Sequence, residues 1–191
     1  MNDKSFFAMA SRMKYINRWG LMRNTSQENI SQHSLEVSMI AHALAVINNE
    51  IFGGDISPEK TAVVAMYHDM SEIITGDMPT PVKYKNTQII SAYKEIEEAA
   101  NNKLLEKLPD NMRGVYEKIL FSEDEKINKL VKAADKLSAY IKCIEEENAG
   151  NREFAKALLA TEKALCKMAC PEADYFIEHF IPAYKLTLDE I

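Results

Sequence analysis

The chain has 191 residues, of which 47% are hydrophobic and 27% charged, with only six Gly and six Pro. This composition supplies a sizeable apolar core, and the scarcity of turn-forming residues excludes the turn-dense all-β folds and favours a mostly helical protein. A net charge of −6 argues against binding to a nucleic-acid polymer, which draws its affinity from basic side chains. It leaves room for a small anionic ligand, which needs only a local basic pocket or a metal ion.

Uninterrupted apolar runs, such as residues 62–67, fall far short of the roughly 20 residues that a bilayer span requires, so no membrane helix is expected. The first residues include an acidic side chain and no apolar stretch of signal-peptide length. Three cysteines cannot all pair within one chain. Together these features predict a protein of the reducing cytoplasm.

Helical periodicity predicts an amphipathic helix over residues 5–16, with a buried stripe of Phe6, Phe7, Ala10, Met13 and Ile16. Residues 17–30 lose this period and predict a long loop, a kind of segment that often carries function. The second helix is expected to begin at the N-cap Ser31 and to end at Gly53-Gly54. Its predicted buried face consists of Leu35, Met39, Ile40, Ala43, Leu44 and Ile47.

The third helix is expected to start at Ser57-Pro58, a capping hydroxyl followed by proline at the first helical position. Residues 61–67 are apolar on every side, so this helix is predicted to be buried all round. A short buried strand would have a similar pattern, and the Ser-Pro start and the length favour the helix. Residues 75–81 end it.

Apolar spacing predicts a long helix near residues 89–104 and a shorter one near 112–119. Ser122 and Glu125 form a capping box for a sixth helix, which ends at Asn148-Ala-Gly150 through a glycine C-cap. Two further helices are expected near residues 152–168 and 172–181. The predicted buried positions of the two middle helices are Ile89, Tyr93, Ile96, Ala100, Leu104, Met112, Val115, Tyr116 and Ile119. The sequence thus predicts one all-α domain over residues 1–191, with about eight helices.

The most informative polar pair is His68-Asp69, at the end of the third predicted helix. Imidazole and carboxylate together suit a borderline divalent metal, and the partial negative charge of a helix C-terminus also favours a cation. If the helix continues, Glu72 projects between these two side chains, one turn further on. Glu72 could then reach a metal-held water without being a ligand itself.

Two other residues could complete a metal site. His33 lies in the first turn of the second predicted helix, beside the polar loop, whereas His42 points to the opposite side of that helix. Asp135 lies on the border of the buried face of the sixth helix, where an unpaired carboxylate is costly and a metal would be a suitable partner.

Each candidate also has a purely structural alternative. His33 could cap its helix, and Asp69 and Asp135 could pair with basic side chains. Glu72 could be a solvated surface charge, and Trp19 could be an apolar anchor beneath the loop. Arg18 and Lys83 could be ordinary solvated charges.

In chain order, His33, His68-Asp69 and Asp135 resemble the H…HD…D signature of the HD-domain metal phosphohydrolases. The resemblance extends over nearly the whole chain to the bacterial HD-domain 5′-deoxynucleotidases, although residues 105–124 carry no recognised motif. The stretches that carry it are Ile16-Asn-Arg-Trp19, Asn29-Ile-Ser-Gln-His-Ser-Leu35, Ala65-Met-Tyr-His-Asp-Met-Ser-Glu72 and Thr75-Gly-Asp-Met-Pro-Thr-Pro-Val-Lys83.

This resemblance implies an all-α, homodimeric, cytoplasmic enzyme that hydrolyses deoxyribonucleoside 5′-monophosphates to deoxynucleoside and phosphate. It implies a divalent metal, namely cobalt, manganese or copper. The implied metal ligands are His33, His68, Asp69 and Asp135. The implied substrate contacts are Arg18, Trp19, Asp77, Met78, Pro79 and Thr80, together with His68, Asp69 and Asp135 of the ligand set.

Hydrolysis of a phosphate ester requires a nucleophilic water, neutralisation of the phosphoryl oxygens and help for the leaving alkoxide. We assign Glu72 to orienting or deprotonating the water and Asp77 to protonating the leaving oxygen, although the two roles could be exchanged. Arg18 offers a planar bidentate donor for the phosphate. Trp19, the only Trp, is expected to place an apolar ring at the 2′ carbon of the sugar and so to select against ribonucleotides.

Two other classes of function stay open at this point. One is an HD-type phosphodiesterase or a hydrolase of the guanosine-tetraphosphate type, which needs room for a second phosphate or a leaving nucleotide. The other is a non-catalytic helical protein in which the metal is structural.

Overall fold

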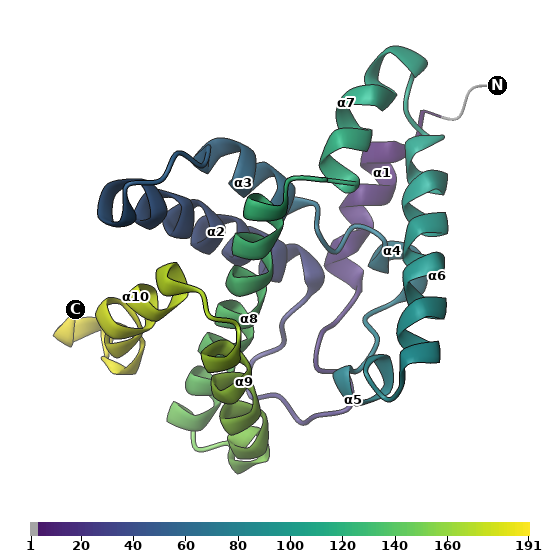
Figure 1. Cartoon of the computed structure of the whole chain (residues 1–191). Coiled ribbons are helices and arrows are strands. Elements are labelled where there is room, and N and C mark those ends of the chain that lie inside the picture. Colours follow the sequence, from purple (N-terminus) through teal and green to yellow (C-terminus); the bar gives the residue numbers. More distant parts are fainter. Residues whose placement is uncertain (1–3) are drawn as a thin grey trace. The chain divides into compact units, whose positions relative to one another are not determined.

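Ten α-helices and four short 3₁₀-helices make up the computed structural model, which describes residues 4–191 (Figure 1). Within that range there is no β-strand, and a single antiparallel bridge joins Asn17 to Asn29. The all-α class predicted from the sequence is therefore confirmed. The helices fall into two compact units, between which the chain alternates. The first unit contains residues 4–21, 27–34 and 67–123, and the second contains 22–26, 35–66 and 124–191.

The first unit is organised around α6 (Thr87–Leu105), which contacts α1 (Phe6–Ala10), α4 (Glu72–Thr75), α5 (Thr80–Lys83) and α7 (Asp110–Leu120). The 3₁₀-helix η1 (Ser11–Tyr15) continues α1, and the first turn of α2 (Ile30–Phe52) also belongs to this unit. Its buried core consists of Phe6, Met13, Ile30, Met70, Leu104, Leu105 and Leu108.

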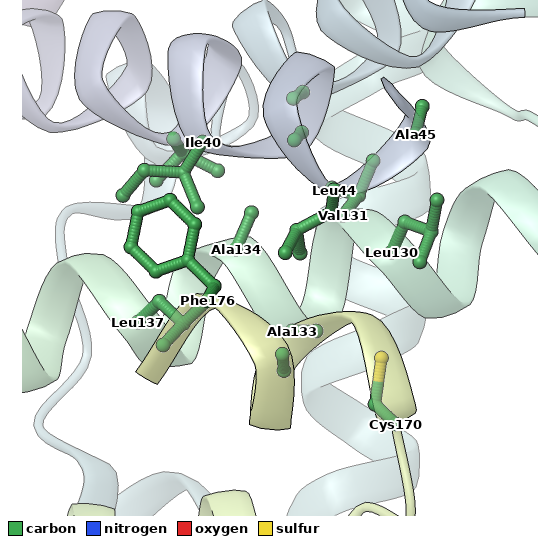
Figure 2. Packing of buried hydrophobic residues seen from close by; sticks show 14 of the residues in the cluster. Ile40, Leu44, Ala45, Leu130, Val131, Ala133, Ala134, Leu137, Cys170 and Phe176 are labelled. Atoms are coloured by element: carbon green, nitrogen blue, oxygen red, sulfur yellow. The ribbon is translucent and has the colours of Figure 1, made fainter. Parts of the chain in front are cut away.

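The second unit is organised around α8 (Glu125–Asn148), which packs against α3 (Pro58–Met66), α9 (Ala155–Lys167) and α10 (Pro171–His179). Three 3₁₀-helices complete it: η2 (Arg152–Phe154), η3 (Ile181–Lys185) and η4 (Leu188–Glu190). Side chains from α2, α8 and α10 converge in its core (Figure 2). The labelled side chains of that core are Ile40, Leu44, Ala45, Leu130, Val131, Ala133, Ala134, Leu137, Cys170 and Phe176.

The helix starts follow capping chemistry, although two of the predicted caps are wrong. The predicted start at Ser57 is confirmed, because its hydroxyl accepts a hydrogen bond from the amide of Lys60 at 3.2 Å. α2 is capped by Asn29 instead of Ser31, since Asn29 and Gln32 each accept a hydrogen bond from the other's backbone N–H at 3.0 Å. α8 is capped by Asp124 instead of Ser122.

Several predicted core faces are rotated. On α2, Leu35 and Met39 are 56% and 60% exposed, whereas the small residues Ala41 and Ala45 are fully buried. The predicted positions Ile40, Leu44 and Ile47 are buried, so the buried face is shifted to include Val37, Ala41 and Ala45 in place of Leu35 and Met39. The other predicted core residues that lie exposed are Phe7, Ile96 and Val115. α3 is also only partly buried, since Val63 and Met66 are exposed.

The segment after α3 differs most from the sequence expectation. α3 ends at Met66, and residues 67–71 form turns that lead into the four-residue helices α4 and α5. These two short helices account for a count of ten where about eight were predicted. Residues 68–72 therefore do not continue the helix, and the prediction that helical geometry places Glu72 between His68 and Asp69 is wrong.

α2 is long and apolar, although the sequence led us to expect no membrane helix. Its 23 residues include a window with mean hydropathy 1.2, so by length and composition alone it could cross a bilayer. Core helices pass the same test. The buried positions Val37, Ile40 and Leu44 belong to the core of the second unit, and this packing accounts for the hydropathy of the helix.

A buried carboxylate anchors one loop of the second unit to α8. Glu146 is 1% exposed and accepts hydrogen bonds from the amide and hydroxyl of Thr25 at 2.9 and 2.7 Å, from Asn151 at 2.7 Å, and from Lys142. Burial alone would raise the pKa of Glu146, but the hydrogen bonds from Lys142, Asn151 and Thr25 hold it well below its ordinary value.

We expect Glu146 to give the protein an acid-labile component of stability. Because its pKa is lower in the folded than in the unfolded chain, its contribution is complete above the unfolded value of about 4.3 and is lost as the pH falls below it. Glu146→Gln leaves Lys142 buried without its charged partner, which costs about 3–5 kcal/mol at neutral pH, and flattens the acid limb. Denaturant unfolding between pH 3 and 7 measures both effects. Glu147→Gln, at an exposed position on the same helix, is the control; identical acid limbs in Glu146→Gln and the parent would contradict the prediction.

Candidate functional site

Three predicted metal ligands converge in the first unit. His33 lies in the first turn of α2, and His68 and Asp69 lie in the turn after α3. The Nε2 atoms of His33 and His68 lie 3.5 and 3.2 Å from Oδ2 of Asp69. The two imidazole centroids are 5.3 Å apart, and each ring presents a nitrogen within 4.8 Å of one on the other. Two imidazole nitrogens and a carboxylate oxygen meeting at one point form a donor set that fits a divalent transition metal.

The turn that carries this dyad is held by its backbone and by the core. The amide of Met70 donates to the carbonyl of Tyr67 at 3.1 Å, and the amide of Glu72 donates to the carbonyl of Asp69 at 3.0 Å. The Met70 side chain is fully buried in the core of the first unit. These backbone bonds and the buried Met70 hold His68, Asp69 and Glu72 in place relative to one another.

The predicted loop brings Arg18 and Trp19 to the same place. The amide of Arg18 donates to the carbonyl of Glu28 at 2.9 Å, and that of Ile30 donates to the carbonyl of Ile16 at 3.0 Å. These two bonds join the ends of the loop. The guanidinium NH1 of Arg18 then lies 3.9 Å from Oδ2 of Asp69. Arg18 is therefore not an ordinary solvated charge, and Arg18 and Trp19 both contact carboxylates that face the histidines.

Glu28 is a residue of this cluster that the sequence reasoning missed. Its Oε2 accepts a hydrogen bond from the indole N–H of Trp19 at 2.9 Å, and its Oε1 lies 3.6 Å from Nδ1 of His33. Burial would raise the pKa of Glu28, but His33, Arg18 and Trp19 hold it below its ordinary value. The available signal in the sequence was its position directly before the N-cap Asn29, in a loop already suspected of function.

Two further carboxyl groups stand beside the ligands. Glu72 is buried, and its Oε2 has no hydrogen-bond partner among residues 4–191. Burial, then the charges of Asp69 and Asp77, raise the pKa of Glu72 to about 9. Burial also raises the pKa of Asp77, although Arg18 and the backbone N–H of Trp19 oppose the shift. Crowded carboxylates with one guanidinium among them favour the arrival of a cation.

Residues 78–81 follow Asp77 and contain two prolines, which stiffen the chain. The contacts that join the cluster do not include them. Met78 and Pro79 are half-buried and Thr80 is exposed, so their contact with substrate stays a prediction. Lys83 is not a solvated charge: its Nζ donates to Glu97 at 2.9 Å and lies 4.6 Å from the ring centroid of Tyr93. Burial would lower the pKa of Lys83, but Glu97 raises it above its ordinary value.

Asp135, the fourth predicted ligand, belongs to the second unit. It lies on α8 next to the fully buried Ala134 and is itself half-buried, as its border position predicted. Its Oδ2 lies 3.5 Å from Nζ of Lys136. Its role as a metal ligand stays a prediction.

A family described as 5′-deoxynucleotidase YfbR-like matches residues 5–184. The chain belongs to the YfbR-like family. Over its whole length it is 51% identical to a 5′-deoxynucleotidase of Klebsiella pneumoniae and 50% identical to the 5′-deoxynucleotidase YfbR of Shigella dysenteriae, covering 97% of each. The match includes the segment 105–124, in which the sequence alone offered no motif.

Solved structures confirm the HD-domain fold of this YfbR-like chain. An HD-domain phosphohydrolase from Listeria innocua superposes with a TM-score of 0.78 at 24% identity, over 96% of this chain and 90% of that one. The cyanophage S-2L HD phosphohydrolase DatZ, bound to dA and one catalytic Zn²⁺ ion, superposes with a TM-score of 0.68 at 17% identity. That alignment covers 94% of this chain and 96% of the phage protein.

We expect Asp69→Asn to weaken metal binding in this YfbR-like protein while leaving it folded. The substitution keeps the shape of the side chain and removes the charge that meets both histidines. Loss of an outer partner of a metal ligand typically costs about 10–100-fold in affinity, so loss of a ligand should cost at least that much. Competition with a chromogenic chelator measures the change. Asp110→Asn, on the exposed side of α7, is the control, and equal affinity in Asp69→Asn and the parent would remove Asp69 from the ligand set.

Proposed function

We propose that this protein is a metal-dependent 5′-deoxynucleotidase that hydrolyses deoxyribonucleoside 5′-monophosphates to deoxynucleoside and phosphate. The observation that carries the chemistry is the meeting of His33, His68 and Asp69 around one carboxylate oxygen. The substrate class is supported by relatives of that name at 50–51% identity over the full chain.

The metal would be held by His33, His68 and Asp69, and we propose Asp135 as the fourth ligand from its place in the H…HD…D pattern. Of the divalent metals, cobalt, manganese and copper are our preferred candidates, because imidazole and carboxylate donors accept all three. When bound, such a metal supplies a water that is nucleophilic at neutral pH and neutralises charge on the phosphoryl oxygens.

The side chains around the ligands divide the remaining tasks. Arg18 lies beside Asp69 and can direct its planar fork at two phosphoryl oxygens. Glu72, with its pKa raised to about 9, keeps its proton near neutral pH unless positive charge offsets its burial. It can therefore serve as the base toward water only when Arg18 and a cation are close. Asp77 would protonate the leaving oxygen, and the two carboxyl groups could exchange these roles.

The test of this function is a phosphate-release panel. We expect the metal-loaded protein to release phosphate from deoxynucleoside monophosphates and to leave diesters and triphosphates intact. Glu72→Gln should retain metal and lose about 10²–10⁴ in kcat, the usual value of general acid–base help. Loss of phosphate release in this variant would also show that the activity of the parent does not come from a contaminating phosphatase. Hydrolysis of a diester in preference to monoesters would support the HD-type phosphodiesterase instead, and no hydrolysis by a metal-loaded protein would indicate a structural metal.

We further propose that Trp19 selects the deoxyribose sugar. Its indole is fixed by Glu28 beside Arg18, so a substrate whose phosphate contacts Arg18 brings its sugar toward an apolar ring. Rejection of an extra hydroxyl by an apolar wall is worth about 10² in specificity. We expect Trp19→Ala to reduce the ratio of kcat/KM for deoxyadenosine monophosphate over adenosine monophosphate, and Trp19→Phe to preserve most of it. A ratio that is the same in Trp19→Ala and the parent would assign the discrimination to another residue.

We also propose that the protein is a homodimer of the cytoplasm. Leu35, Met39 and Val46 are exposed and share one face of α2, and such an apolar stripe suits a self-complementary interface. The three cysteines, two buried and one exposed, form no disulfide within residues 4–191, as a reducing compartment allows.

We expect Met39→Glu to convert a dimer into a monomer. A charge at the centre of an apolar interface has to be desolvated without a partner, which opposes association. Sedimentation velocity on the parent and the variant measures the change, with Lys132→Glu, at an exposed position of α8, as the control for added negative charge. A parent that sediments as a monomer would reject the proposal.

A further inference from the structure

Glu28 contacts three side chains that the proposed function places in different roles. Its carboxylate is 12% exposed, so it is nearly removed from water. One oxygen, Oε2, accepts from the indole N–H of Trp19 at 2.9 Å and lies 3.6 Å from Nε of Arg18. The other oxygen, Oε1, lies 3.6 Å from Nδ1 of His33. A single carboxylate thus contacts Trp19, which would close on the sugar, Arg18, which would hold the phosphate, and the proposed metal ligand His33.

The backbone fixes Glu28 in this position. Its carbonyl accepts from the amide of Arg18 at 2.9 Å, within the bridge that pairs Asn17 with Asn29. The next residue, Asn29, caps α2, and its carbonyl accepts from the amide of His33 at 3.1 Å. The register among Arg18, Glu28 and His33 is therefore set by main-chain bonds and does not depend on the side chains alone.

His33 is oriented accordingly. Its Nδ1 faces Glu28, and its Nε2 faces Asp69 at 3.5 Å. A carboxylate on the far nitrogen of an imidazole fixes the ring and leaves the other nitrogen available as a ligand. The side chain of His33 is fully buried, so the ring has little freedom to turn away when Glu28 is present.

Trp19 has an unusual backbone. Its φ angle is +57°, in the left-handed region that large side chains rarely occupy. Such a conformation persists only where surrounding contacts determine it. The indole N–H donates to Glu28 and the backbone N–H of Trp19 donates to Asp77, so the carboxylate that faces His33 is one of the groups that hold this strained residue.

We propose that Glu28 is a positioning residue that couples the metal site to the sugar pocket: it fixes the imidazole of His33 and the indole of Trp19 relative to each other. This inference rests on the proposed function, which makes His33 a metal ligand and Trp19 a contact of the sugar. The contacts of Glu28 with both residues are present in the chain itself. His33 would present Nε2 to a bound metal while its Nδ1 faces Glu28, so a change of charge on the ring would reach the indole through the shared carboxylate.

The sequence offers a direct probe, because Trp19 is the only Trp among 191 residues and its fluorescence reports on that side chain alone. Zn²⁺ is a suitable probe metal, since it has no redox chemistry and a filled d shell. We expect Zn²⁺ to shift the emission of the parent at the concentration that saturates its site. In Glu28→Ala, the apparent dissociation constant for Zn²⁺ should rise about 10–100-fold, and saturating Zn²⁺ should leave the emission unchanged.

Two further variants make the experiment decisive. Glu28→Gln keeps an oxygen that can accept from the indole but loses the charge facing His33, so it should retain the parent emission without metal and still bind Zn²⁺ more weakly. Gln27→Ala, the exposed neighbour in the same loop, should behave as the parent in both measurements. Circular dichroism establishes that each variant is folded, and Glu28→Gln carries the test if Glu28→Ala is not.

These readouts are independent of turnover. If the parent hydrolyses no deoxynucleotide but the Glu28 variants change affinity and emission as stated, the coupling stands and the proposed function fails. If the parent is active and Glu28→Ala or Glu28→Gln binds Zn²⁺ with the parent affinity and gives the parent emission shift, Glu28 is not a positioning residue.

Discussion

The carboxylate of Asp69 is the group on which the candidate site depends. One of its oxygens, Oδ2, lies within 3.5 Å of both histidine Nε2 atoms and 3.9 Å from Arg18. These partners come from the start of a long helix, from a turn and from a loop, and His33 and Arg18 are far from Asp69 in sequence. The burial of the Met70 side chain fixes the turn that contains Asp69. The precision of the site therefore derives from packing in the first unit more than from any one helix.

The electrostatics of this cluster explain how an acidic protein can accept a phosphate. The charges of Asp69 and Asp77 raise the pKa of Glu72, the charge of Asp69 raises that of Asp77, and Arg18 opposes both shifts. A phosphate dianion arriving among ionised carboxylates would be repelled. A divalent cation would offset this local negative charge, which the net charge of −6 does not reveal. Burial and then the neighbouring charges raise the pKa of Glu72, and a protonated carboxyl group contributes no repulsion.

The sequence predicts the helices and the chemistry well, but not the details of packing. The Ser57-Pro58 start follows from a local rule, because a cap acts over a few residues. The exposure of Leu35 and Met39 on α2 could not be predicted, since the exact limits of its buried face depend on the helices that pack against it. Glu28 was missed for a related reason: its importance comes from Trp19 and His33, nine and five residues away along the chain, which only the bridge between Asn17 and Asn29 brings together.

The alternation of the chain between its two units has a consequence for modularity. The chain changes unit five times, at residues 21/22, 26/27, 34/35, 66/67 and 123/124, and one of these changes falls inside the continuous helix α2. No single cut of the polypeptide releases either unit intact. Neither unit can therefore be excised or grafted onto another protein as one continuous segment of chain.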